Sequence, residues 1–185
     1  NDVFPTAMHI VTWHKVTTSL LPNLKKLQLE LGRKAEESKT AVKSGRTHMM
    51  DATPVTLGQE FDAFAAQVEF AIDNIANSLE SCLALPIGGT AVGTGYNSHP
   101  RWAQLMASEL GDIYSCDFRP AKNKFSQMAS HDALRGVHGQ ISGLATALYK
   151  ISSDIRLMNS GPRCGFSEIT IPANEPGSSI MPGKV

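Results

Sequence analysis

The sequence predicts an all-α fold, a bundle of long helices, and three observations carry this prediction. Apolar residues recur at helical spacing along three long stretches. Strand-like alternation is almost absent, with residues 168–171 as the one candidate. Glycine-rich or proline-rich segments separate the helical stretches. With 185 residues, the chain is long enough to bury one substantial core.

The first long helix is expected over residues 4–31. Pro22 should kink it near Leu21, because proline lacks the N–H group that bonds to the carbonyl one turn back. A shorter helix is expected to follow over residues 34–43. The apolar stripe of the first helix consists of Trp13, Val16, Leu20, Leu24, Leu27 and Leu31.

A second long helix is expected over residues 56–82, with a shorter one over residues 100–110. Apolar residues three and four positions apart share one face of a helix, so the longer segment should bury a single stripe. The stripe of the second long helix consists of Phe61, Phe64, Val68, Ile72, Ile75 and Leu79.

The clearest periodicity lies between residues 126 and 160. Its apolar residues alternate spacings of three and four for more than three heptads, which is typical of a long helix packed nearly parallel to others. At ~1.5 Å per residue this helix would be roughly 50 Å long. The seam consists of Leu134, Val137, Ile141, Leu144, Leu148, Ile151, Ile155 and Met158.

Three irregular segments, residues 45–54, 86–100 and 159–185, lie between or after the helices. Long irregular segments are typical of lids and binding loops, although a surface excursion fits the same composition. The first two flank the same long helix, so they should lie roughly 40 Å apart in one subunit. If both carry chemistry, they meet only when a second subunit packs alongside. We therefore expect an oligomer with sites at subunit interfaces.

The overall composition argues against several classes of binding partner. The chain has 17 basic and 17 acidic residues without a run of either sign, which argues against nucleic acid or an anionic membrane. No apolar run reaches the about 18 residues of a membrane span. Cys82, Cys116 and Cys164 are far apart and form no Cys-x-x-Cys pair, which favours a reducing compartment.

Neither a metal site nor a nucleotide site is expected. His131 and His138 are about two helical turns apart, which is too far to share a zinc ion. The segment from Gly177 to Gly183 has one residue too many for a P-loop, and Val185 stands where such a loop has serine or threonine.

Two loop motifs carry residues suited to chemistry. His48 follows Thr47 in a loop that begins at a glycine, and histidine is a common acid–base group, although a loop histidine is often only a surface hydrogen-bonding group. Ser178 and Ser179 follow a glycine, and Lys184 lies six positions beyond Ser178. This pattern suits a flap that brings a base and a cation to an anionic substrate, but a plain surface loop fits the same residues.

Several motifs resemble those of the fumarase/aspartase superfamily, in order along the whole chain. Residues 177–184, Gly-Ser-Ser-Ile-Met-Pro-Gly-Lys, resemble its signature loop, and residues 45–54 resemble its second motif. Residues 1–5 resemble the region that follows the paired serines of its first motif. The chain is most similar to class II, metal-independent fumarases, because aspartases carry glutamine where this chain has His48. Further matches are residues 88–95, 123–125 and 160–164.

The resemblance implies reversible hydration of fumarate to (S)-malate without a metal or other cofactor. It implies an all-α fold that oligomerises through long central helices into a homotetramer, with each active site drawn from three subunits. Ser178 would be the base that removes the C3 proton of malate, through an aci-carboxylate intermediate. His48 would act at the water or hydroxyl group, directly or through a water. The resemblance assigns the substrate carboxylates to Asn1, Thr47 and Lys184, and flap support to Ser179.

The resemblance also sets the domain organisation that we expect. Residues 1–185 would form part of the central helical domain, with the catalytic flap at residues 174–185. An N-terminal domain and a C-terminal region would lie outside this segment, which we expect to be inactive alone. The expected compartment is the cytoplasm or the mitochondrial matrix. The alternatives are an aspartase, an argininosuccinate- or adenylosuccinate-type lyase, or a catalytically inactive structural homologue.

Overall fold

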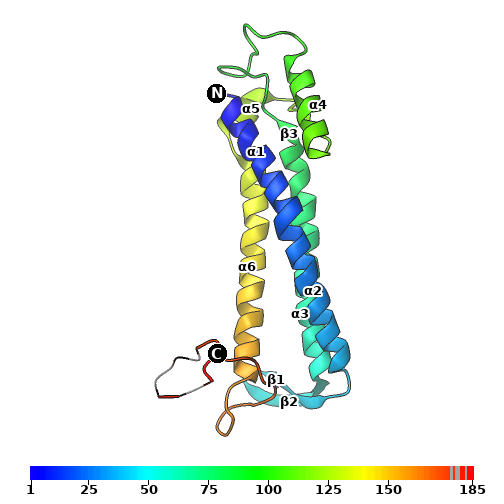
Figure 1. Cartoon of the computed structure of the whole chain (residues 1–185), viewed down its shortest axis with the longest axis vertical. Helices are drawn as coiled ribbons and strands as arrows, with labels where there is room; N and C mark the ends of the chain where they lie inside the picture. Colours follow the sequence, from blue (N-terminus) through cyan, green and yellow to red (C-terminus); the bar gives the residue numbers. More distant parts are fainter. Residues whose placement is uncertain (176, 178–179, 182) are drawn as a thin grey trace. The chain divides into compact units, whose positions relative to one another are not determined.

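The computed structural model describes residues 1–175, 177, 180–181 and 183–185. Its described part is mainly helical, as predicted (Figure 1). The chain divides into two compact units, Asn1–Leu144 and Ala145–Val185. One long helix, α6 (Asp132–Met158), runs through the boundary between the units.

The first expected helix is present but contains a π-helical turn. Helix α1 (Val3–Lys15) continues through the π-helix η1 (Val16–Leu20) into α2 (Leu21–Glu37). The irregularity lies directly before Pro22, where the expectation placed a kink. The Leu21 N–H donates to the Val16 carbonyl, five residues back, as a π-helix requires. The turn therefore accommodates the missing proline donor without breaking the helix.

The separate helix expected at residues 34–43 is wrong. Helix α2 itself ends at Glu37, and strand β1 (Val42–Thr47) begins soon after it. Of the first apolar stripe, Leu27 remains 38% exposed, whereas Leu24 and Leu31 are buried.

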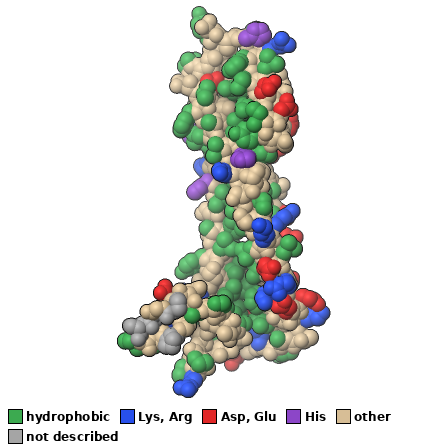
Figure 2. Space-filling model, viewed as in Figure 1, with side chains coloured by type: hydrophobic (Ala, Val, Ile, Leu, Met, Phe, Trp, Pro, Cys, Tyr) green, Lys and Arg blue, Asp and Glu red, His purple; other side chains and the backbone are tan. Residues whose placement is uncertain are grey.

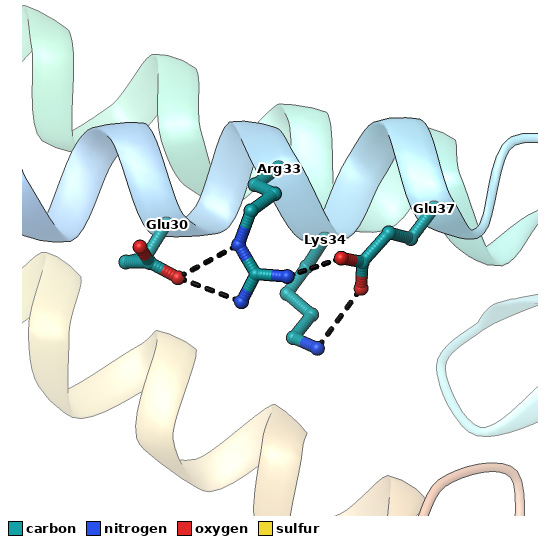
Figure 3. Close-up of polar contacts among 4 residues, drawn as sticks. All are labelled: Glu30, Arg33, Lys34 and Glu37. Atoms are coloured by element: carbon teal, nitrogen blue, oxygen red, sulfur yellow. Dashed lines mark hydrogen bonds and ion pairs between the residues drawn. The ribbon is translucent and has the colours of Figure 1, made fainter.

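Charged side chains cover the exposed face of α2. Arg33 donates from Nε and Nη2 to Glu30 Oε2 at 3.0 and 2.8 Å, and it also bonds to Glu37 (Figure 3). Lys34 Nζ donates to Glu37 Oε2 at 3.0 Å. These bonds raise the pKa of Arg33 and lower that of Glu37. All four groups are solvent-exposed neighbours on one helix, so they form a solvated face and not a binding site.

The second expected helix is confirmed as α3 (Leu57–Ser78), followed by a 3-10 turn, η2 (Leu79–Leu83). It begins with a capping box: Thr56 Oγ1 accepts from Gln59 N at 3.1 Å, and Gln59 Oε1 accepts from Thr56 N at 2.9 Å. All six residues of its predicted stripe are buried. Helix α2 packs along α3 (Figure 1).

Gly58, in the first turn of α3, lies against the backbone at and just beyond the end of α2, and it leads to a stability prediction. A Cβ at Gly58 would lie 2.5 Å from the Ala35 carbonyl oxygen and 2.7 Å from Lys39 Cα. Because backbone cannot give way as a side chain does, Gly58→Ala should lower the free energy of unfolding by about 1–3 kcal/mol. Thermal unfolding of the full-length protein measures this change.

A matched control lies on the partner helix. Gly32, in the interior of α2, has nothing within 4 Å of its ideal Cβ position. Gly32→Ala should therefore raise stability, by about 0.5–1 kcal/mol, through helix propensity alone. Equal melting temperatures for the Gly58→Ala and Gly32→Ala proteins would contradict the packing argument.

The segments that directly follow α3 pack against α1 and against one another. Strand β3 (Ala84–Leu85) pairs in parallel with β4 (Arg119–Pro120), and α4 (Trp102–Tyr114) lies between them in sequence. The core at this end gathers residues from α1, β3 and the segments beside the strands. It consists of Ile10, Leu85, Ile87 and Phe118.

The long C-terminal helix is shorter at its start than expected. The chain forms α5 (Lys124–Ala129), leaves helical geometry at Ser130, and enters α6 only at Asp132. No residue of the predicted seam is exposed, so its heptad pattern is confirmed. The strand expected at residues 168–171 is wrong, because the backbone there bonds to the end of α6 and the residue beyond it. Glu168 N donates to the Met158 carbonyl at 2.8 Å, and Ile171 N donates to Asn159 Oδ1 at 2.9 Å.

Candidate active site

Thr47 and His48 lie at the tip of a β-hairpin, not in the irregular loop that was expected. Strand β1 pairs antiparallel with β2 (Met50–Thr56), and Thr47 stands opposite Met50. The two turn residues, His48 and Met49, have φ values of 49° and 68°. Two left-handed residues form the tight primed turn that suits a hairpin, but this geometry strains residues other than glycine. Such strain is concentrated at functional sites.

The hairpin is anchored at its base. Between Ser44 and Arg46 the strand register shifts, and a Cβ on the buried Gly45 would lie 2.6 Å from the Thr53 carbonyl oxygen. Lys43, whose side chain is mostly buried, donates to Glu60 Oε2 on α3 at 2.6 Å. The start of α3 therefore sets the position of the exposed tip that carries Thr47 and His48.

Asn1 belongs to a different cluster, beside the glycine-rich segment 88–95. Its Nδ2 donates to the Ala91 carbonyl at 2.9 Å. The neighbouring Asp2 carboxylate is buried and accepts from the N–H groups of Gly88 and Thr90 at 2.8 and 3.0 Å. These bonds hold the glycine-rich segment against the start of α1.

The structure does not bring these two clusters together. The hairpin precedes α3 and the glycine-rich segment follows it, so the 22 residues of that helix alone separate them by roughly 33 Å. Figure 1 shows β1 and β2 at one end of α3 and the start of α1 at the other. The expected separation of the two loops within one subunit is confirmed.

Lys184 closes a loop within the second unit. Its carbonyl accepts from the N–H groups of Asn174 and Glu175 at 2.9 and 3.0 Å, and Glu175 and Lys184 form an antiparallel bridge. The Lys184 side chain is exposed. Ser178 and Ser179 lie outside the described residues. The bridge therefore fixes the base of the predicted flap.

A second closed turn precedes the flap. Ser160 Oγ accepts from Phe166 N at 3.1 Å, and the Ser160 carbonyl accepts from Ser167 N at 2.8 Å. A Cβ at Gly165 would lie 2.3 Å from the Ser160 carbonyl carbon, so only glycine fits there. This turn contains the matched motif 160–164 and exposes Cys164.

In the described part of the chain, the buried polar side chains lie along one stripe on α1 and at its start. This stripe was not predicted from the sequence. Asp2, Thr6 and His9 are four and three positions apart and are all buried. His9 Nδ1 lies 3.2 Å from the Cys82 carbonyl, which can only accept, so Nδ1 carries the proton. His9 is a fully buried core residue, and its Nε2 has no hydrogen-bond partner among the described residues.

Burial of His9 gives a pH prediction for stability. Desolvation lowers the pKa of His9, helped by His131 and opposed by backbone groups of Cys82 and Ala84. An unfolded histidine titrates at about pH 6.5, so below that pH the unfolded chain binds more protons than the folded one. We expect stability to be full above about 6.5 and to fall as the pH drops below it.

The His9→Asn protein measures that contribution. The asparagine amide can take the place of Nδ1 toward Cys82 but does not titrate. Chemical unfolding of full-length wild-type and His9→Asn proteins between about pH 5 and 8 should show a flatter dependence in the variant. Parallel curves for the two proteins would show that His9 is not the group responsible.

Other parts of the described structure add no further catalytic group. A polar cavity of about 430 Å³ at the end of α4, lined by residues that include Asp112 and Asp117, contains none of the predicted site residues. Across the described part of the chain, no three His, Cys, Asp or Glu side chains gather as ligands for a metal ion. Nor does any helix described here combine the length and apolar character needed to cross a bilayer.

Comparison with known proteins shows to which family the chain belongs. All 185 residues match the family described as Lyase. The chain belongs to this lyase family. It is 52% identical to a class II fumarate hydratase of Methylorubrum extorquens and 51% identical to one of Helicobacter pylori. Both alignments cover the whole chain but only 39% and 40% of those relatives, so the chain spans about 40% of their length.

Solved structures of this lyase family share the fold. A crystal structure of class II fumarase from Schistosoma mansoni matches with a TM-score of 0.89 and 42% identity, over the whole chain and 42% of that protein. A fumarate lyase:delta crystallin from Brucella melitensis matches with a TM-score of 0.90 and 37% identity, over the whole chain and 40% of that protein. The resemblance seen in the motifs of this chain, to class II fumarases and as a partial chain, is confirmed.

Proposed function

We propose that the full-length protein is a fumarate hydratase that interconverts fumarate and (S)-malate. The observation that carries the proposal is an identity of about one half to class II fumarate hydratases over all 185 residues. The hairpin tip that carries Thr47 and His48 supports it, because it is exposed and its backbone is strained, as is common at functional sites.

The proposed reaction needs a base, a set of anion-binding donors and a group at the departing hydroxyl. Ser178 takes the C3 proton of malate, and the electron pair moves into the neighbouring carboxylate to form the aci-carboxylate. Asn1, Thr47 and Lys184 stabilise the two carboxylates, which carry more charge in that intermediate than in malate. The C2–O bond then breaks, and the hydroxide leaves as water with a proton delivered through His48. Ser179 supports the flap.

We further infer that this chain contributes the central helical domain, with the flap at residues 174–185, and that the enzyme is a homotetramer with shared sites. The separation of Asn1 from His48 by α3 supports sharing. Large apolar side chains also remain at the surface, and Figure 2 shows hydrophobic side chains on the face it draws. Among them Phe4, Phe70 and Tyr149 are 75%, 73% and 78% exposed.

Helix α6 supports the same inference. Gly136, Gly139 and Gly143 lie inside it, where each glycine costs about 1 kcal/mol relative to alanine. Nothing lies within 4 Å of an ideal Cβ at any of the three. A helix of a neighbouring subunit approaching closely at these positions would offset that cost. The three free cysteines support a reducing compartment, the cytoplasm or the mitochondrial matrix.

The activity is tested with the full-length protein and two substrates. Fumarate formation, read as ultraviolet absorbance, should follow addition of malate and not of aspartate. Fumarate from aspartate alone would instead identify an ammonia-lyase, and fumarate from neither would remove the hydratase.

Shared sites are tested by mixing subunits. His48→Asn and Asn1→Ala proteins should each be nearly inactive. Random co-assembly of equal amounts should restore about a quarter of wild-type activity, because that share of sites pairs an intact Asn1 with an intact His48. Mixed tetramers that stay inactive would show that both residues act from one subunit.

A further inference from the structure

Asp2 is the only buried acidic side chain in the described part of the chain. A buried carboxylate is unfavourable unless hydrogen bonds replace its water. Asp2 stands at the start of α1, where a carboxylate commonly caps its own helix, yet it makes no such bond. Its Oδ2 accepts instead from the backbone of Gly88 and Thr90, at 2.8 and 3.0 Å. Charged acceptors make the stronger class of hydrogen bond, so Asp2 holds this segment firmly.

The segment that Asp2 holds is strained. Gly88 and Thr90 have φ values of 87° and 58°. A β-branched residue such as Thr90 is a conformational outlier in the left-handed region, because its side chain crowds the backbone there. Thr90 Oγ1 is buried and has no hydrogen-bond partner among the described residues, so its own side chain does not offset that strain. The bond from Thr90 N–H to Asp2 opposes relaxation of this backbone.

The strained backbone in turn orients Asn1. The carbonyl of Ala91, the residue after Thr90, accepts from Asn1 Nδ2 at 2.9 Å. That bond fixes the carboxamide, because a carbonyl can accept only from its nitrogen end. One amide N–H is thereby used, and the second remains to donate to a substrate carboxylate.

We propose that Asp2 is a positioning residue for the hydration reaction, which acts through Thr90 and Ala91 to aim the Asn1 carboxamide at a substrate carboxylate. The proposal rests on the proposed function, because the role of Asn1 does. Asp2 itself touches no substrate. Removing its carboxylate lets the strained segment relax and the carboxamide turn, which weakens carboxylate binding in the ground state and in the transition state.

A double-mutant cycle in the full-length protein tests this role. Asp2→Ala should lower kcat/KM for malate about tenfold, mostly through KM, and Asp2→Asn less, because its amide oxygen still accepts. Since Asp2 acts through Asn1, the Asn1→Ala/Asp2→Ala protein should be no less active than Asn1→Ala alone. Asp117→Asn, at a carboxylate that is 89% exposed, is the matched control and should match wild type.

Additive losses in the cycle, or an unchanged kcat/KM in Asp2→Ala, would overturn the proposal. If Asp2→Ala does not fold, the cycle is run with Asp2→Asn, whose side chain has nearly the same size. Succinate, a dicarboxylate that does not react, should bind about tenfold more weakly to the same variants, which measures positioning without turnover. If wild-type protein acts on aspartate and not malate, the proposed function fails, and the same cycle on aspartate still tests Asp2.

Discussion

Replacing Ser178 with alanine in the full-length protein is expected to lower kcat for malate about 10³-fold, while KM changes little. The C3 proton of malate is weakly acidic, so its removal without a positioned base leaves only electrostatic stabilisation of the aci-carboxylate. Alanine keeps the flap backbone and removes one oxygen. The measurement is steady-state fumarate formation, together with succinate binding to show that the site still assembles.

The neighbouring hydroxyl provides the control for that experiment. Ser179→Ala makes the same chemical change one residue away and should reduce kcat far less than Ser178→Ala, because Ser179 is assigned only to flap support. Near wild-type activity in Ser178→Ala would remove the serine-base mechanism. A larger loss in Ser179→Ala would move the base to that residue.

Replacing Lys184 with methionine is expected to raise KM for malate and weaken succinate binding, each by about 10–100-fold. The substitution removes a charged hydrogen-bond donor to a substrate carboxylate. The backbone bridge that closes the flap loop should persist, because Asn174 and Glu175 bond to the backbone carbonyl of Lys184 and not to its side chain. Isothermal titration with succinate measures the effect directly.

Lys184→Arg tests whether charge alone is sufficient. Arginine keeps the positive charge but presents a planar fork in place of a compact ammonium group, so it should recover part of the lost affinity. Full affinity in the methionine variant would show that Lys184 does not contact the substrate.

The helices could be predicted from sequence because each buries one stripe of its own residues. The stripe of α3 and the seam of α6 are local patterns, and tertiary contacts did not override them. The β1–β2 hairpin was not predicted, because it lacks such a local pattern. Most of its residues are exposed, so no alternation of buried and exposed positions marks it. Its turn, His48-Met49, also lacks the glycine or asparagine that usually signals a hairpin.

The site could be predicted only as separate pieces. Short motifs identified His48, Thr47, Asn1 and the flap, because the resemblance lies in contiguous residues. The role of Asp2 left no such signal, since its partners Gly88 and Thr90 lie 86 and 88 positions away. An acidic residue at a helix start reads as an ordinary cap, and only the folded chain shows that it binds elsewhere.

The π-helical turn before Pro22 determines how α2 is rotated about its own axis, which is called its rotational phase below. Each residue turns an α-helix by about 100°, so the extra residue in η1 determines which side chains face α3. Deleting one residue from this turn to restore a regular helix would swing Leu24 and Leu31 out of the contact. Replacing a residue there without changing the chain length would leave the phase intact. This part of the molecule therefore tolerates changes in residue identity far better than changes in chain length.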